Sequence, residues 1–284
     1  MPYRELQQTL ESVPTSDGAG VKLRRSIGAT PARRLDPFLM LDEFFSDNPD
    51  DYLAGFPPHP HRGFETVTYM LDGHMQHRDH LGNTGDLGPG SVQWMTAARG
   101  IIHSEMPQQQ DGRMRGFQLW LNLPAAEKMQ PASYRDIRAD QIPEVALTGG
   151  GRVRVIAGQF QDLEAGTRTA GTVDSGSTAA IYLDLQLAPD SSVHLGLPEQ
   201  HNALVYSYDG QMMLAEQQLP LHAAALLSPG ASIRLQAGPT GGRALLLAGK
   251  PLDEPIVQYG PFVMNSREEI EQALRDYRDG TLAA

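Results

Sequence analysis

Short apolar runs separated by turn residues make up most of this chain. Residues 64–71 (FETVTYML) are rich in aromatic and β-branched side chains, and Asp72-Gly73 follows them directly. Such residues favour strands, and Asp-Gly favours a tight hairpin turn. Residues 92–96 (VQWMT) and 117–123 (FQLWLNL) show the same pattern, so we predict a strand in each. Residues 74–91 (HMQHRDHLGNTGDLGPGS) are polar and glycine-rich, and we predict a loop there.

The second half of the chain has a similar organisation. Residues 181–187 (IYLDLQL) alternate apolar and polar side chains, and residues 201–208 (HNALVYSY) lead into Asp209-Gly210. Residues 244–248 (ALLLA) predict a late buried strand. Two β halves with parallel turn signals indicate two domains. We predict their bounds as residues 1–140 and 141–284, with the linker in the proline- and glycine-containing region 130–151.

One helix is predicted, at the end of the chain. Ser266 and Glu269 have the spacing of a capping box, in which each side chain satisfies the other residue's backbone N–H. Apolar side chains then recur at helical spacing, and Gly280 ends the pattern. We expect this helix to pack on a sheet. The apolar positions are Ile270, Ala273, Leu274 and Tyr277.

The composition agrees with a soluble globular protein built from many short strands. Of 284 residues, 40% are hydrophobic and 20% are charged, which allows a sizeable core. The 29 glycines and 21 prolines are scattered, as turns between strands require. There is no cysteine, which excludes disulfides, zinc ribbons and a thiolate nucleophile.

The charge balance is acidic, with a formal net charge of −11. This charge, without a long run of Lys or Arg, argues against direct nucleic-acid binding. The first fourteen residues (MPYRELQQTLESVP) lack the apolar core of a signal peptide, and no run of about eighteen apolar residues predicts a membrane helix. We therefore expect a soluble, cytoplasmic protein without a membrane partner.

Two short stretches carry the candidate chemistry. Residues 56–65 read FPPHPHRGFE, and residues 99–106 read RGIIHSEM. Alternate residues of a strand point to the same side, so His59 and His61 would share a face, as would His103 and Glu105. If the two strands are neighbours, these four side chains converge. Three imidazoles and a carboxylate suit a divalent metal such as iron, manganese, nickel, copper or zinc.

A second carboxylate complicates this ligand set. Glu65 has the same parity as His59 and His61, so it could face the same point. In one interpretation Glu65 is the carboxylate ligand and Glu105 supports the site from outside. In the other, Glu105 binds the metal and Glu65 does not. Spacing leaves both interpretations open.

The remaining candidate residues carry weaker signals. His74, His77 and His80 recur at intervals of three within the predicted loop, and we prefer a solvated loop to an accessory metal site. His194, His201 and His222 have no HxH partner, so we expect a structural role for His201 and no metal in the second domain. No GxSxG, P-loop or GxGxxG motif supports another enzyme class. Four large side chains are expected in the core or in the apolar walls of a site: Trp94, Met95, Phe117 and Trp120.

Several longer stretches closely resemble the pirin family. They are Arg34 with LDPFLMLDEF (35–44), FPPHPHRGFETVTYMLDG (56–73), GSVQWMTAARGIIHSEMP (90–107), FQLWLNLP (117–124) and EPIVQYGPFVMNSREEI (254–270). The resemblance runs over nearly the whole chain. It implies an all-β bicupin fold: two jelly-roll β-barrel domains with a C-terminal α-helix.

The resemblance also implies a ligand set. The family's metal ligands match His59, His61, His103 and Glu105, which favours Glu105 over Glu65, and the metal belongs to the N-terminal cupin alone. We expect one divalent transition metal, with iron first and manganese, nickel, cobalt, copper or zinc as alternatives.

Two functions follow from the resemblance. Some pirins are similar in activity to quercetinases, the dioxygenases that open the central ring of a flavonol with dioxygen and release carbon monoxide. In that case Glu105 is the catalytic base, and the substrate is an aromatic, flavonol-like molecule. Other pirins act as metal-dependent regulators that bind a protein partner, such as a transcription cofactor or a metabolic enzyme. We favour the dioxygenase, with the non-catalytic regulator as the alternative.

Overall fold

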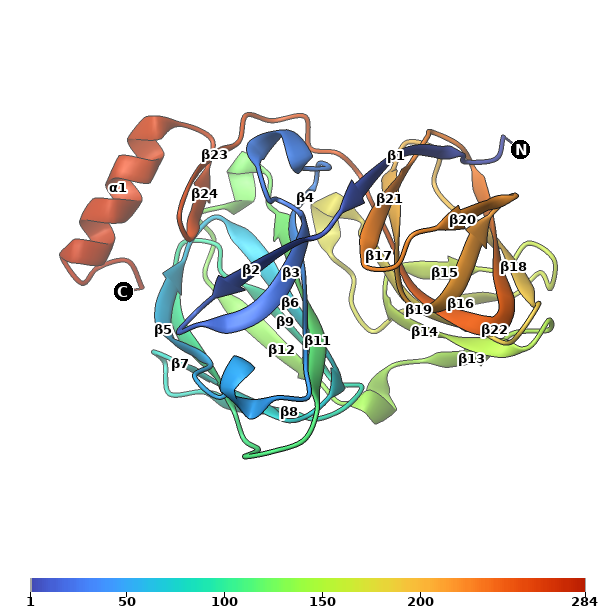
Figure 1. The fold of residues 1–284 in the computed structure, drawn as a ribbon. Helices are drawn as coiled ribbons and strands as arrows, with labels where there is room; N and C mark the ends of the chain where they lie inside the picture. The colour runs from blue at the N-terminus through green and yellow to red at the C-terminus, as the bar shows by residue number, and fades with distance from the viewer. Residues whose placement is uncertain (1, 284) are drawn as a thin grey trace. The chain divides into compact units, whose positions relative to one another are not determined.

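The computed structural model describes residues 2–283, and these residues form two compact units. The unit that we call the N-barrel comprises Pro14–Gly28, Phe38–Ala139 and Leu252–Ala284. The C-barrel comprises Met1–Val13, Ala29–Pro37 and Asp140–Pro251. Each is built of antiparallel strands, so the predicted all-β bicupin fold is confirmed (Figure 1).

The N-barrel contains a seven-stranded and a four-stranded sheet. The larger has the order β12-β9-β6-β11-β4-β3-β2, and the smaller has the order β5-β10-β7-β8. The strands are β2 (Val13–Asp17), β3 (Val21–Ile27), β4 (Phe38–Ser46), β5 (Phe56–His61), β6 (Phe64–Asp72), β7 (Met75–Asp79), β8 (Thr84–Leu87), β9 (Val92–Thr96), β10 (Ile101–Pro107), β11 (Met114–Asn122) and β12 (Ser133–Ile137). Two 3-10 turns, η2 (Pro49–Asp51) and η3 (Ala125–Glu127), connect them.

The C-barrel centres on a nine-stranded sheet. Its main path is β1-β21-β19-β22-β17-β14-β13, and β18 and β20 pair with β22 and β19. The strands of this unit are β1 (Leu6–Glu11), β13 (Glu144–Ala146), β14 (Gly151–Ala157), β15 (Gln159–Gln161), β16 (Arg168–Ala170), β17 (Ile181–Leu187), β18 (Ser192–Gly196), β19 (Asn202–Leu214), β20 (Gln217–Leu219), β21 (Ala223–Leu227) and β22 (Ser232–Gly249). The short turns are η1 (Pro31–Arg33), η4 (Ala139–Gln141) and η5 (Gly176–Thr178).

The predicted strands are all present, but the predicted loop at 74–91 is wrong. Residues 75–79 and 84–87 form β7 and β8, which pair with each other and, through β7, with β10. In β7 the buried positions alternate, with Met75 and His77 inside. The alternation was hidden because a histidine, which counts as polar, occupies a buried position.

The predicted helix is confirmed as α1 (Arg267–Arg278), the single α-helix within residues 2–283. Ser266 accepts a hydrogen bond from the Glu269 backbone N–H, and the Glu269 side chain accepts one from the Ser266 N–H. Ile270 and Ala273 bury their side chains against Phe262 and Met264 of the two-stranded sheet β23 (Val257–Tyr259) and β24 (Phe262–Met264). The expected packing of the helix on a sheet is therefore observed (Figure 1).

The N-terminal strand belongs to the C-barrel, and the C-terminal segment belongs to the N-barrel. The predicted bounds of 1–140 and 141–284 do not include this exchange. Strand β1 belongs to the C-barrel because it pairs with β21, from Leu6 opposite Leu227 to Glu11 opposite Ala223. The segment 252–284, with α1, belongs to the N-barrel. There Arg62 donates to Asp276 of α1 at 2.6 Å. Local patterns identify the elements, but the partner of each element is set by contacts distant in sequence.

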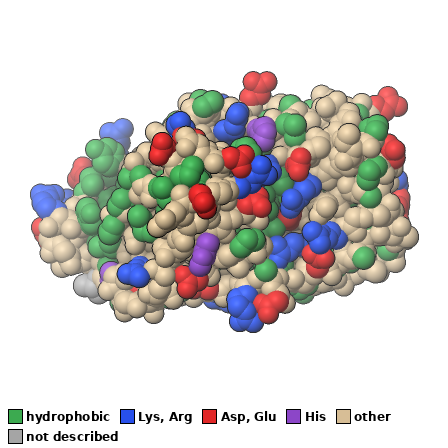
Figure 2. Space-filling view, turned by 60° about the horizontal axis from the view of Figure 1, so that its bottom comes forward, with side chains coloured by type: hydrophobic (Ala, Val, Ile, Leu, Met, Phe, Trp, Pro, Cys, Tyr) green, Lys and Arg blue, Asp and Glu red, His purple; other side chains and the backbone are tan. Residues whose placement is uncertain are grey.

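Charged side chains of both signs are mixed on the surface. Figure 2 shows acidic and basic groups side by side over the face that it displays. Within residues 2–283 no helix has the length and apolar character needed to cross a membrane.

Candidate metal centre

Strands β5 and β10 bring the two histidine-containing stretches together. In this antiparallel pair His103 lies opposite His59, and Ile101 lies opposite His61. Because side chains alternate along a strand, His59 and His61 point to one side, and His103 points to the same side. One ring nitrogen of each histidine lies within 4.8 Å of the other two. The predicted pairing of the two stretches is confirmed, and we call these three residues the histidine triad.

The ring nitrogens of the triad are oriented for a shared ligand. His59 Nδ1 donates to the Pro57 carbonyl at 2.8 Å, and its Nε2 lies 3.0 Å from His61 Nε2. His103 Nε2 is buried and has no hydrogen-bond partner within residues 2–283. Burial, aided by the neighbouring imidazoles, lowers the pKa of His61 and of His103 well below the usual value. Neutral imidazoles with inward lone pairs fit a metal ion, which would satisfy the buried nitrogen of His103.

Glu105 reaches the same space from β10. Its side chain is buried, and Oε1 lies 2.9 Å from the Thr68 hydroxyl on β6. The same hydroxyl lies 2.6 Å from the Gln118 amide oxygen on β11. One hydroxyl hydrogen serves one acceptor, so we assign the Gln118 amide with its NH₂ group toward Thr68, which then donates to Glu105. A chain of hydrogen bonds thus fixes the Glu105 carboxylate.

Glu65 has a different environment. Its position on β6 is opposite Thr96 of β9, and its Oε1 accepts a hydrogen bond from the Thr96 hydroxyl at 2.6 Å. Burial raises the pKa of Glu65 to about 6. Glu65 does not line the cavity that His59, His61 and Glu105 line. Of the two carboxylates left open by spacing, Glu105 is the one beside the triad in this cavity.

His77 is the histidine that sequence reasoning placed wrongly. It was expected in a solvated loop, but it is fully buried on β7, and its Nδ1 lies 3.2 Å from His103 Nδ1. The other two histidines of that region are partly exposed, and His80 contacts the Ala283 carbonyl at 3.0 Å. His74 lies 3.6 Å from Asp86. Met75 and His77 are two residues apart, which is the spacing of side chains on one face of a strand. This spacing was the signal in the sequence that could have indicated a buried His77.

A cavity of about 680 Å³ opens beside the triad within the N-barrel. Met40, Phe44, Phe56 and Trp120 form much of its apolar wall. Trp120 thus has the expected wall position. The other three large side chains of that prediction, Trp94, Met95 and Phe117, are buried and do not line the cavity.

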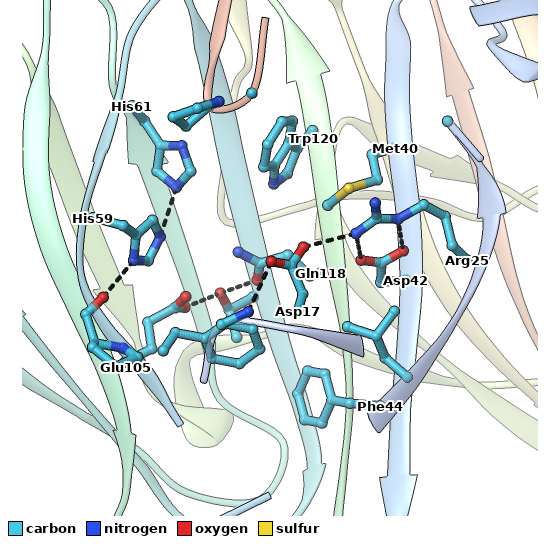
Figure 3. A pocket seen from close by; sticks show the side chains of 18 of the residues that line it. Asp17, Arg25, Met40, Asp42, Phe44, His59, His61, Glu105, Gln118 and Trp120 are labelled. Atoms are coloured by element: carbon cyan, nitrogen blue, oxygen red, sulfur yellow. Dashed lines mark hydrogen bonds and ion pairs between the residues drawn. The ribbon is translucent and has the colours of Figure 1, made fainter. Parts of the chain in front are cut away.

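On the side of the cavity away from His59 and His61, charged side chains lie between Met40 and Phe44 (Figure 3). Arg25 donates to both carboxylate oxygens of Asp42, at 2.8 and 2.7 Å, and also to Asp17 at 2.9 Å. Burial raises the pKa of Asp42 to about 6, and the hydrogen-bonded Arg25 guanidinium opposes that rise. The sequence analysis did not predict that these charged residues lie together. They are far apart in sequence, and only the β3–β4 pairing brings Arg25 opposite Asp42.

The histidines of the C-barrel are dispersed. His194 stacks on Tyr3, with ring centroids 5.1 Å apart. The backbone carbonyl of His201 accepts a hydrogen bond from the buried Arg4 at 2.8 Å, which agrees with a structural position. Among residues 2–283, the histidine triad is the only group of three or more potential ligands whose atoms converge.

Comparison with known proteins places this geometry in a family context. A family model described as pirin matches residues 20–121, and one described as the pirin C-terminal cupin domain matches residues 182–283. The chain is 57% identical over 285 residues to a Pseudomonas aeruginosa protein named "Putative quercetin 2,3-dioxygenase", covering 99% of both chains. It is 40% identical to human pirin over 270 residues, which is 93% of this chain and 89% of the human one.

A solved structure has the same fold along the whole chain. It is described as quercetin 2,3-dioxygenase from Acinetobacter baumannii, and it superposes with a TM-score of 0.89 at 33% identity. The match covers 100% of this chain and 99% of that one.

Proposed function

This chain belongs to the pirin family, and from that membership and the site geometry we propose that it is a metal-dependent dioxygenase that cleaves flavonol-type substrates with dioxygen. The observation that carries the proposal is the convergence of three imidazoles, two of them buried, beside an aromatic-lined cavity whose lining includes His59 and His61. The Acinetobacter baumannii protein is described as a quercetin 2,3-dioxygenase and the Pseudomonas aeruginosa protein is named "Putative quercetin 2,3-dioxygenase", which supports this choice of reaction.

The histidine triad and Glu105 would hold the metal. We propose a divalent transition metal, with iron first, because imidazole and carboxylate ligands combined with dioxygen chemistry are typical of non-haem iron. When bound, the metal supplies Lewis acidity toward a substrate hydroxyl and redox chemistry toward dioxygen. The residues contribute fixed nitrogen lone pairs: His59 is oriented by the Pro57 carbonyl, and His61 and His103 are kept neutral by burial.

Glu105 is the proton acceptor in this proposal. A flavonol reacts as its enolate, so the 3-hydroxyl proton must leave, and a carboxylate beside the site can take it as general base. The hydrogen bond from Thr68 to Oε1 holds the carboxylate at the cavity, while Gln118 holds Thr68. Oε1 is thus used for orientation, and the other oxygen would serve both as metal ligand and as proton acceptor, which requires that the carboxylate loosen from the metal when it takes the proton.

The cavity walls select and orient the substrate. Trp120, Phe44 and Phe56 offer flat apolar contact to an aromatic ring system. The charged cluster of Arg25 and Asp42 gives the other end polar character. An aromatic molecule with polar groups at its edge is the ligand class that this lining accommodates.

The test is flavonol turnover in Glu105→Gln, with Glu65→Gln as the matched control. Both replacements are isosteric and both sites are buried, but only Glu105 lines the cavity. We expect oxygen-dependent flavonol decay in the wild type, a loss of about 10²–10⁴-fold per bound metal in Glu105→Gln, and near-wild-type turnover in Glu65→Gln.

Two outcomes would contradict the proposal. Equal losses in both variants would remove the special role of Glu105 as proton acceptor. A metal-loaded wild type that leaves every flavonol unchanged would reject the dioxygenase and favour the non-catalytic regulator.

A further inference from the structure

We infer that His77 is a positioning residue for the metal site: its Nδ1 accepts the Nδ1–H of His103 and so holds His103 with Nε2 toward the metal. This inference rests on the proposed metal-dependent function. It concerns a side chain that neither the expected ligand set nor the cavity lining includes.

The strand pairing places His77 next to the site, on the same face of the sheet as Glu105 and His103. Strand β7 runs antiparallel to β10, with His77 opposite Glu105 and Asp79 opposite His103. The imidazole rings of His77 and His103 have centroids 4.8 Å apart, and their Nδ1 atoms are 3.2 Å apart. Both side chains are buried, so bulk solvent does not reach these two nitrogens.

The proton positions follow from the ligand role of His103. A neutral imidazole that offers Nε2 to a metal carries its hydrogen on Nδ1. Because the two Nδ1 atoms face each other, one must donate and the other must accept. His103 is therefore the donor, and His77 is the acceptor with its hydrogen on Nε2. The opposite assignment would put the hydrogen of His103 on Nε2, where it blocks the metal.

His59, another member of the histidine triad, also has a hydrogen-bond partner on the nitrogen that would not bind the metal. His59 Nδ1 donates to the Pro57 carbonyl, which leaves Nε2 free. Ligand histidines of metal sites nearly always have such a partner on the second nitrogen. Within residues 2–283, the hydrogen bond with His103 is the only one that the His77 ring makes, since its Nε2 is buried without a partner. We therefore assign His77 the role of accepting this hydrogen bond from His103.

The test compares two replacements that differ in the acceptor. His77→Leu fills the space without an acceptor, whereas His77→Asn offers Oδ1 near the position of Nδ1. Affinity for Co²⁺ is measured by competition with a chelator, together with the visible absorption of the Co²⁺ protein and thermal unfolding of the metal-free protein. His74→Ala is the control, because His74 precedes the same strand and is 45% exposed.

We expect His77→Leu to lose about 10–100-fold in Co²⁺ affinity with an altered absorption spectrum. His77→Asn should recover most of the affinity, and His74→Ala should match the wild type. A merely structural role would lower the unfolding temperature of the metal-free protein and leave the spectrum unchanged.

Three results would overturn the inference. In folded protein, wild-type affinity for His77→Leu would reject it, and so would equal losses in the Leu and Asn variants. If His77→Leu does not fold, a more than tenfold loss in folded His77→Asn rejects it instead. If the wild type binds Co²⁺, these results reject the role of His77 but not the proposed function. A wild type that binds no metal rejects both the role of His77 and the proposed function.

Discussion

The two barrels of this protein use the same architecture and fill it differently. The interior of the C-barrel is a continuous cluster of aliphatic side chains, among them Val205, Leu235 and Leu246, all without solvent exposure. The N-barrel instead has a cavity of about 680 Å³ with histidines, carboxylates and an arginine in its lining. A cupin barrel thus serves either as a packed core or as the wall of a site.

The difference also appears in the buried charges. The N-barrel buries Asp42, Glu43, Arg62, Glu65, Glu105, Arg115 and Lys128, whereas the C-barrel buries Arg4, Asp162 and Asp184. Buried charges destabilise a fold unless they are paired. The N-barrel accordingly supplies partners, such as Arg115 for Glu43 at 2.9 Å and three oxygen acceptors for Lys128. The barrel with the cavity therefore contains more buried charges that need such partners than the filled barrel does, where Arg4 and Asp184 are likewise hydrogen-bonded.

The largest expected effect is on metal content, which should depend on the histidines of the N-barrel but not on those of the C-barrel. His103→Ala removes one of three converging ring nitrogens, and we expect metal content to fall from about one per chain to near zero after dialysis. His201→Ala in the C-barrel should keep the wild-type content, since its ring belongs to no such cluster. Metal analysis of the purified proteins measures both. Retained metal in His103→Ala would break the contrast between the barrels.

A smaller effect is expected on the free energy of unfolding, which should differ between truncations in the filled C-barrel and in the N-barrel with its cavity. Leu246→Ala, in the C-barrel core, should reduce the free energy of unfolding by about 4 kcal/mol, because it leaves a new void. Met40→Ala enlarges an existing cavity, so we expect about 2 kcal/mol, the low end for such truncations.

Denaturant unfolding followed by circular dichroism gives these values. Trp94 and Trp120 both belong to the N-barrel, so tryptophan fluorescence reports on that unit alone. A Met40→Ala cost equal to that of Leu246→Ala would contradict the packing difference.

The smallest predicted effect depends on pH and sharpens the contrast between Glu65 and Glu105. Burial raises the pKa of Glu65 from 4.5 to about 6, so the folded state favours its neutral form. That contribution to stability is complete below pH 4.5 and is lost as the pH rises through 6. Relative to Glu65→Gln, which does not titrate, the wild type should lose about 2 kcal/mol between pH 4 and 7. Parallel pH–stability curves for the two proteins would show that Glu65 is not held in its neutral form.

Much of the site follows from the sequence because strand parity is a local property. The HPH and HSE patterns place His59 with His61 and His103 with Glu105, and pairing of β5 with β10 is enough to make the three imidazoles converge. β6, with its aromatic and β-branched residues before Asp72-Gly73, and α1, with its capping box, were predictable because their signals are also local.

The rest depends on contacts between distant segments. Thr68 and Gln118 support Glu105 from β6 and β11, but they read locally as ordinary polar positions of strands. His77 reads as a loop residue until β10 pairs with β7 and buries it. The exchange of β1 and α1 between the barrels is likewise a matter of pairing and packing, which no local pattern encodes.

The most direct test of the account is to supply dioxygen to metal-loaded protein and a flavonol that have been mixed without it. Metal-free protein, Fe²⁺-loaded protein and Fe²⁺-treated His59→Ala are compared, and flavonol loss and carbon monoxide are measured before and after oxygen is admitted. We predict that Fe²⁺-loaded wild type alone consumes the flavonol, only after oxygen is admitted, with one carbon monoxide released per flavonol. Metal bound at the triad with the flavonol unchanged in oxygen would contradict the central claim.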